Sequence, residues 1–208
     1  MNYVEYGKEN KYDDNIFFQK YSQMSRSQQG LAGAGEWETL RELLPDFKDK
    51  RVLDLGCGYG WHCIYAMEHG ASSVVGVDIS HKMLEVAKEK THFPQVEYKC
   101  CAIEDVEFPE ESFDVILSSL AFHYVADYEI LVKKIYRILK SGGKLVFTVE
   151  HPVFTAYGTQ DWYYNEKGEI LHFPVDNYYY EGKRTAVFLG EKVTKYHRTL
   201  TTYLNTLL

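Results

Sequence analysis

Three glycines at alternate positions follow a short apolar segment, and their spacing could support ligand chemistry. Residues 52–55 are typical of a buried strand, and Gly56, Gly58 and Gly60 follow directly, ahead of a stretch at 61–69 with helical character. Glycine lets a ligand approach the backbone closely, and the free N–H groups in a helix's first turn favour an anionic group. The sequence therefore predicts a ligand-binding turn here.

An acidic residue follows the next predicted strand. Asp78 comes 24 positions after Asp54 and directly after the apolar run at 74–77. A carboxylate in this position can accept hydrogen bonds from both hydroxyls of a ribose. The glycine turn and Asp78 together predict a nucleoside site, although either Asp54 or Asp78 could instead cap a neighbouring turn or helix.

The glycine spacing bears on which nucleoside is bound. The turn reads GxGxG, whereas the dinucleotide fingerprint is GxGxxG, and Trp61 stands where its third glycine would be. This disfavours a nicotinamide-dependent oxidoreductase, which remains one alternative. A non-catalytic cofactor-binding module is another.

Four segments occur in a specific order and spacing: LDLGCGYG, VVGVDIS, FDVILSS and ILKSGGKLVFT. Together they resemble the class I S-adenosylmethionine-dependent methyltransferases, specifically the small-molecule group that includes the ubiquinone and menaquinone methyltransferases. The resemblance spans residues 36–152. It implies S-adenosylmethionine as cofactor, S-adenosylhomocysteine as product and a small molecule as methyl acceptor.

The resemblance also implies roles for individual residues. Asp54 would order the turn and reach the amino acid end of the cofactor, and Asp78 would hold the ribose. Ala102 stands where the family usually has an aspartate, and Glu104 is a candidate substitute. The remaining residues implied in cofactor binding are Gly56, Cys57, Gly58, Ile79, Met83, Ile103, Ser118, Ser119 and Leu120.

Two histidines are candidates for a general base. Ligand sites in open parallel sheets lie beyond the carboxyl ends of the strands, where His123 follows the fourth predicted strand and His151 the fifth. Histidine titrates near neutral pH, so either could accept a proton, and a structural or substrate-contacting role is the alternative. Methyl transfer needs a base only if the nucleophile arrives protonated.

The elements that must position these residues form an alternating pattern. Strands are predicted at 51–55, 73–77, 96–100, 113–117 and 144–149, separated mostly by helices, at 61–69, 82–90 and 128–139 among others. This pattern is typical of a doubly wound, Rossmann-like α/β fold with a mostly parallel sheet and helices on both faces. Residues 36–152 are the predicted cofactor-binding core.

Two further segments flank this core. Residues 1–35 are a polar N-terminal arm or lid that contains Tyr21, and residues 153–196 are an aromatic-rich excursion expected to act as a substrate lid. If both fold over the site, their rings would suit a flat or cationic substrate and shelter the sulfonium, although strand tyrosines can simply cover a sheet. Residues 197–208 are predicted to be the final core helix. The resemblance to class I methyltransferases implies an antiparallel hairpin after this helix, and the sequence offers none, so we expect either a longer natural chain or a second copy over the exposed edge.

Composition excludes several classes of protein. The formal charge of −7 has the wrong sign for gripping nucleic-acid phosphates, and no stretch has the roughly 18 to 20 apolar residues needed to cross a bilayer. The N-terminus is too polar for a signal peptide. The four cysteines lack the spacing of a zinc site or disulfide framework, so free thiols and no metal are expected. These features predict a soluble, cytoplasmic protein.

Overall fold

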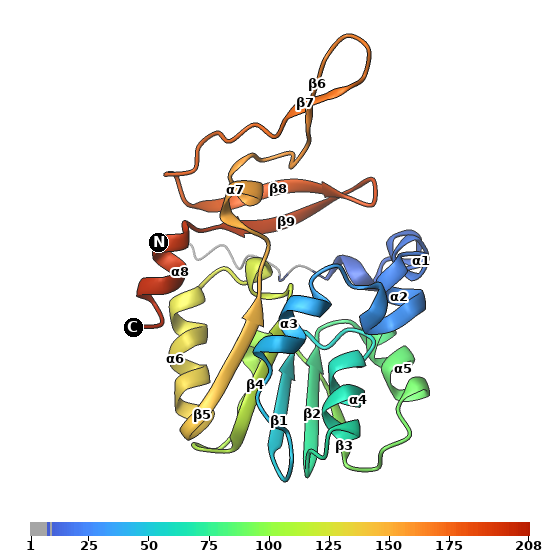
Figure 1. Ribbon diagram of the computed structural model, residues 1–208, viewed down its shortest axis with the longest axis vertical. Coiled ribbons are helices and arrows are strands. Elements are labelled where there is room, and N and C mark those ends of the chain that lie inside the picture. The colour runs from blue at the N-terminus through green and yellow to red at the C-terminus, as the bar shows by residue number, and fades with distance from the viewer. Residues whose placement is uncertain (1–7, 9) are drawn as a thin grey trace, which may run out of the picture.

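The computed structural model describes residue 8 and residues 10–208, so part of the arm predicted at 1–35 lies outside the described residues. Five parallel strands form the central sheet in the order β3-β2-β1-β4-β5. Their bounds are β1 Arg51–Leu55, β2 Ser73–Asp78, β3 Val96–Cys100, β4 Phe113–Ser119 and β5 Leu139–Thr148. Figure 1 shows the strands side by side with helices around them, which confirms the predicted α/β fold.

Apolar side chains on both faces of the sheet explain its burial. Alternate strand residues point to opposite faces. Val52 and Leu117 pack with Cys63 and Leu84 on one side, where α4 (Trp61–Glu68) and α5 (His81–Lys90) lie. Leu53 and the other strand residues on its face of the sheet pack on the opposite side. They contact α6 (Tyr128–Ile138), η3 (Ile103–Asp105) and η4 (Phe122–Tyr124). The helix α3 (Trp37–Leu43) precedes β1.

Two expected boundaries differ from the structure. The strand predicted at 144–149 begins earlier, because Phe113 pairs with Leu139 before a register shift and the regular pairing of Val115 with Lys144. The helix predicted over 197–208 is limited to α8 (Leu200–Asn205), because the preceding residues pair as a strand up to His197. Tyr203 anchors α8 in the core cluster of α6, with its ring 5.0 Å from that of Tyr128.

The arm consists of η1 (Lys11–Asp13), α1 (Asn15–Ser22), α2 (Ser25–Gln29) and η2 (Gly30–Gly33). The excursion contains α7 (Pro152–Ala156) and two hairpins, β6 (Tyr163–Tyr164) with β7 (Ile170–His172) and β8 (Gly182–Phe188) with β9 (Glu191–His197). Figure 1 shows the arm and the excursion beyond the carboxyl ends of the parallel strands. Both segments are therefore placed to line a site at that edge. Within the described residues, no helix is long and apolar enough to span a membrane.

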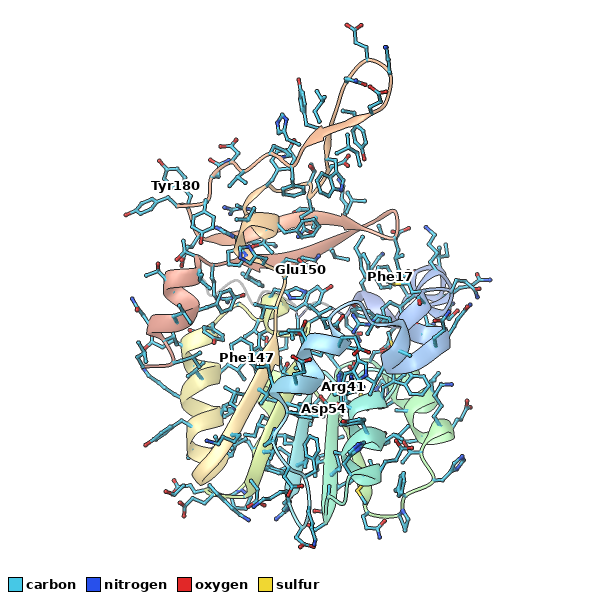
Figure 2. The ribbon with its side chains drawn as sticks, viewed as in Figure 1. Phe17, Arg41, Asp54, Phe147, Glu150 and Tyr180 are labelled. Atoms are coloured by element: carbon cyan, nitrogen blue, oxygen red, sulfur yellow. The ribbon has the colours of Figure 1, made fainter. Side chains whose placement is uncertain are left out.

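Arm and excursion meet in a small apolar cluster of their own. Phe17 of α1 is fully buried against Ala186 and Val193 of the β8–β9 hairpin, and its ring lies 5.7 Å from that of Phe188. Figure 2 shows Phe17 beside this hairpin, well away from the central core around Asp54. By contrast, Tyr179 and Tyr180 lie outside any strand and are 85% and 69% exposed, so they do not cover a sheet.

Candidate functional site

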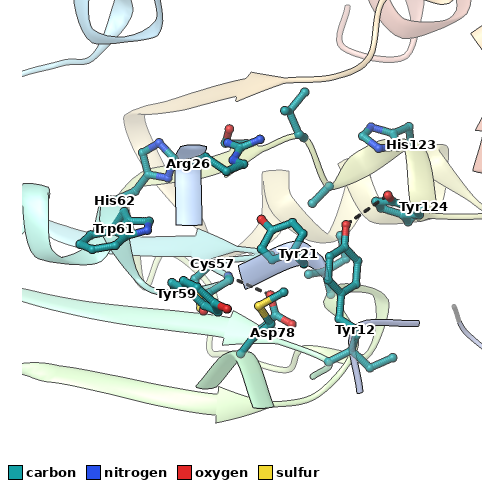
Figure 3. Close-up of a pocket in the computed structure, with 18 of the residues that line it drawn as sticks. Tyr12, Tyr21, Arg26, Cys57, Tyr59, Trp61, His62, Asp78, His123 and Tyr124 are labelled. Atoms are coloured by element: carbon teal, nitrogen blue, oxygen red, sulfur yellow. Dashed lines mark hydrogen bonds between the residues drawn. The ribbon is translucent and has the colours of Figure 1, made fainter. Parts of the chain in front are cut away.

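A large cavity lies at the carboxyl ends of the parallel strands. It is open to solvent on one side, and the space between its walls is about 1350 Å³ with that open part included. Its walls come from the arm, the glycine turn, the ends of β2 and β4, and Phe188 of β8. Figure 3 shows how residues from these separate segments face one another across it. Clefts of this kind, mainly apolar with a few polar groups, are the usual form of a small-molecule site.

The glycine turn forms the floor of the cavity. Gly56, Gly58 and Gly60 have φ angles of +79°, +53° and +75°, in the left-handed region that disfavours side chains. A Cβ atom on Gly56 would lie 2.5 Å from the Cβ of Ala121, so this position also needs glycine for space. On Gly58 the same atom would meet no protein atom within 4 Å, because the backbone there faces open space.

Asp78 is tied to this turn by its carboxylate. Oδ2 accepts a hydrogen bond from the backbone N–H of Gly58 and Oδ1 accepts one from that of Ser80, each at 2.9 Å. Burial raises the pKa of Asp78 to about 6, although the two N–H groups act in the opposite direction. Each oxygen keeps lone-pair capacity for a further donor, as a ribose diol would require.

Asp54 lies behind the turn and does not line the cavity. Its Oδ2 accepts a hydrogen bond from the thiol of Cys63 at 3.4 Å, and its buried Oδ1 has no partner among the described residues. Burial raises the pKa of this carboxyl to about 7. The structure therefore places Asp54 beneath the turn, behind the residues that line the cavity.

Most of the other residues suggested by the sequence come together around the cavity. Ser118 is an exception, since its buried hydroxyl donates to the carbonyl of Leu55 at 2.8 Å. Leu120 lines the cavity with φ +54°, a strained value for a residue with a side chain. The cavity is also lined by the sequence candidates Tyr21, Gly56, Cys57, Gly58, Asp78, Ile79, Met83, Ala102, Ile103, Glu104, Ser119 and His123.

The two candidate histidines have different surroundings. His123 is buried at the cavity wall, and burial lowers its pKa to about 4, so the ring is neutral at physiological pH. His151 is exposed and does not line the cavity; it caps α7, where its Nδ1 accepts a hydrogen bond from the N–H of Val153 at 3.2 Å. The two residues are thus not interchangeable.

Several cavity residues were not anticipated from the sequence. Arg26 of the arm lines the cavity and pairs with Glu36 at 2.6 Å, and the same Glu36 oxygen accepts a hydrogen bond from the hydroxyl of Ser119. The hydroxyls of Tyr12 and Tyr124 lie 3.2 Å apart and point toward each other (Figure 3). Among the described residues, no group of three or more His, Cys, Asp or Glu side chains could hold a metal ion.

Comparison with known proteins identifies the family. A model for the methyltransferase domain matches residues 53–147. A structure from Listeria monocytogenes, assigned to the S-adenosylmethionine dependent methyltransferases, is 58% identical over 83% of this chain and 81% of its own, with a TM-score of 0.80. The S-adenosylmethionine dependent methyltransferase from Mesorhizobium loti is 42% identical over 86% and 81%, with a TM-score of 0.79.

A shorter match concerns a protein with a named pathway. The ubiquinone biosynthesis O-methyltransferase of Coxiella burnetii is 36% identical over 53% of this chain. The matched segment covers 47% of that protein's length. These matches favour methyl transfer over the nicotinamide-dependent and non-catalytic alternatives. The chain belongs to the class I S-adenosylmethionine-dependent methyltransferases, with S-adenosylmethionine as its cofactor.

Proposed function

We propose that this methyltransferase moves the methyl group of S-adenosylmethionine to a small molecule by in-line displacement within the cavity of Figure 3. The observation that carries the proposal is the bond between Asp78 and the N–H of Gly58, which fixes a carboxylate beside bare backbone on the cavity floor. This pairing suits a nucleoside whose ribose lies on Asp78.

The residues present fit the rest of the cofactor. Ile79 and Met83 line the same cavity as Asp78 and offer apolar contact for the adenine. Arg26 stands near His62 and Ser119, where its guanidinium could bind the carboxylate of the methionine part. We therefore place the adenosine at the β2 end of the cavity and the amino acid near Arg26.

When bound, the cofactor supplies a methyl group on a positively charged sulfur that is already a good leaving group. The protein's contribution is then to align the acceptor and to exclude water. Tyr12 and Tyr21 of the arm and Tyr124 of η4 supply aromatic walls for this purpose. His123, neutral and buried beside them, is proposed to contact the acceptor.

Calorimetry with S-adenosylmethionine, S-adenosylhomocysteine and NAD tests the cofactor site. We expect micromolar binding of both sulfur ligands and none of NAD, with binding lost in Asp78→Ala. Asp114→Ala is a matched control, because Asp114 accepts from the N–H of Arg51 at the opposite end of the sheet. Equal loss in both variants would contradict the assignment of Asp78.

The in-line course is tested separately with a cofactor that carries a chiral isotopic methyl group. Once an acceptor has been found by radiolabel transfer to a panel of phenols, amines, thiols and carboxylic acids, inversion at the methyl carbon is expected. Retention would exclude a single direct displacement.

The proposal extends to partners and location. The net charge of −7 supports a small-molecule acceptor over nucleic acid, and the free thiols of Cys57 and Cys63 support a cytoplasmic location.

The β5 edge of the sheet and the exposed Leu204 and Leu207 support a homodimer. Sedimentation at equilibrium tests this last point, and a monomer at all concentrations would contradict it.

A further inference from the structure

Glu150 brings a carboxylate to the cavity at the end of β5, three strands along the sheet from β2, which carries Asp78. It follows β5 and lines the cavity together with His123, Tyr124 and Phe188. Figure 2 places Glu150 between the top of the sheet and the β8–β9 hairpin. The core and the excursion therefore build this end of the cavity jointly.

Two residues of the excursion hold this carboxylate in place. Lys195 of β9 donates to Oε1 at 2.5 Å and Gln160 donates to Oε2 at 2.8 Å. Gln160 also accepts from the ammonium of Lys195 at 2.9 Å, which closes the triangle. Lys195 is only 3% exposed, and a buried lysine is costly unless it is paired. Such an arrangement fixes the direction of the Glu150 side chain.

Glu150 stays ionised in this setting. Burial opposes ionisation, but the charge of Lys195 and the hydrogen bonds from Lys195 and Gln160 lower the pKa of the carboxyl below its ordinary value. An ionised carboxylate can accept about four hydrogen bonds, and Lys195 and Gln160 account for two. The remaining capacity is available to a molecule in the cavity.

His123 complements this carboxylate with a donor. Its Nδ1 lies 3.5 Å from the backbone N–H of Glu150 and accepts from it, so the neutral ring carries its proton on Nε2. Nε2 is 4.0 Å from Oε1 of Glu150. In this tautomer Nε2 cannot accept a proton, so Glu150 rather than His123 is the acceptor of this pair.

We propose that Glu150 recognises the methyl acceptor, and that Lys195 and Gln160 are its positioning residues. The acceptor class is then a flat or apolar molecule that presents an N–H or O–H donor, while a carboxylate or other anion at that end is rejected. The rings of Tyr124 and Phe188 flank the ammonium of Lys195 at 6.0 and 5.6 Å and supply the apolar wall. The inference rests on the proposed function and names its substrate class.

Four ring compounds test the inference on protein saturated with S-adenosylhomocysteine. Phenol and benzylamine carry a donor, benzoate is anionic, and anisole has no donor. NMR titration should give dissociation constants for phenol and benzylamine about tenfold or more below those of benzoate and anisole, since the donor pairs with a charged acceptor. Equal binding of all four, or binding of none, would overturn the inference.

Variants assign the selectivity to Glu150. Glu150→Gln alone would leave the buried ammonium of Lys195 without a counter-charge, so the double variant Glu150→Gln with Lys195→Met keeps the site free of an uncompensated charge. It should bind S-adenosylhomocysteine normally and lose the tenfold preference. Glu107→Gln is the matched control, because Glu107 also pairs with a lysine, Lys134 at 3.0 Å, but outside the cavity. A double variant that keeps the preference would refute the assignment.

The single variant Lys195→Met tests whether Lys195 positions the Glu150 carboxylate or only stabilises the fold. It should weaken phenol binding without changing the affinity for S-adenosylhomocysteine, and Lys195→Arg should restore phenol binding. Failure of the wild-type protein to bind S-adenosylhomocysteine would count against the cofactor site, whereas normal cofactor binding without probe selectivity would count against Glu150.

Discussion

The hydroxyl of Ser80 donates a 2.6 Å hydrogen bond to the carboxylate of Asp13, which joins the N-terminal arm to the start of α5. The same Asp13 oxygen accepts from the backbone N–H of Lys82 at 3.1 Å. The N–H of Ser80 in turn donates to Asp78, so the residue that the arm contacts is hydrogen-bonded to the proposed ribose site. When the arm docks, its contact with Ser80 therefore helps to hold Asp78 in position.

The opposite side of the arm is held by apolar contact. Phe17 is fully buried against the β8–β9 hairpin, and exposing it to water would cost about 2 kcal/mol. The hydrogen bonds that Asp13 accepts should contribute about 1.5 to 3 kcal/mol each, because the acceptor is charged. Both sides therefore hold the arm in place, and weakening either side should let it open more readily when ligands enter and leave.

Replacing Asp13 with asparagine should accelerate release of S-adenosylhomocysteine by about tenfold, because the charged hydrogen bonds that close the arm are weakened. Stopped-flow fluorescence can follow release through Trp61, which lines the cavity. Asp127→Asn is the control, since Asp127 caps α6 by accepting from the N–H of Ile130 at 2.9 Å. The Asp127→Asn variant should be less stable than the wild-type protein but should release S-adenosylhomocysteine at the same rate. Identical release from both variants and the wild-type protein would show that Asp13 does not hold the arm.

Asp54 should make the stability of the ligand-free protein depend on pH. Its pKa is raised from 3.8 to about 7, mainly by burial, so the native state keeps a proton that the unfolded state has lost. The free energy of unfolding should therefore fall as pH rises from about 4 to about 7, by on the order of 4 kcal/mol for this group. Below about pH 4, the full contribution of Asp54 to the free energy of unfolding is present.

Urea denaturation of the wild-type protein and Asp54→Asn measures this effect. The other buried groups that titrate, including Asp78, His62 and His123, are present in both proteins and largely cancel in the difference. The wild-type protein should lose stability relative to Asp54→Asn as pH rises through the window. A difference that is constant from pH 4 to 8 would mean that Asp54 ionises normally.

The strands β1, β2 and β4 were predictable because each is a short, mostly apolar run that is buried on both faces of the sheet. The glycine turn and Asp78 were predictable for a related reason: they follow adjacent strands, and the register of Leu55 with Val77 brings both to one edge. The less accurate boundaries, at Leu139 and His197, depend on pairing with residues elsewhere in the chain. Local patterns do not contain that information.

Arg26 and Glu150 could not be placed from the sequence for the same reason. Arg26 reaches the cavity through docking of the arm, and Glu150 is fixed by Lys195, 45 residues later. His151 is adjacent to Glu150 and was the more attractive candidate by residue type. Because side chains of neighbouring residues point in different directions, only one of the two faces the cavity, and residue type alone does not say which.

Gly58→Ala should weaken cofactor binding far more than it weakens the fold. The new Cβ would strain a backbone at φ +53° by about 1 kcal/mol and project into the space that the cofactor requires. Gly142→Ala is a matched control, because Gly142 also has a positive φ of +76° and open space around it but does not line the cavity. Thermal unfolding should be affected similarly in both variants, and calorimetry should show loss of S-adenosylhomocysteine binding in Gly58→Ala. Normal binding by Gly58→Ala would place the cofactor elsewhere.

Arg26 should contribute to binding through the amino acid part of the cofactor. Arg26→Gln removes a guanidinium at the cavity wall, and loss of a charged hydrogen bond should lower the affinity for S-adenosylhomocysteine by about tenfold or more. Methylthioadenosine has the same adenosine but no carboxylate, so its affinity should not change. Arg41→Gln serves as control, because Arg41 forms a similar pair with Glu38 at 2.8 Å on the surface. Equal weakening of both ligands by Arg26→Gln would mean that Arg26 acts by holding the arm through Glu36, and the carboxylate would then have to bind another group.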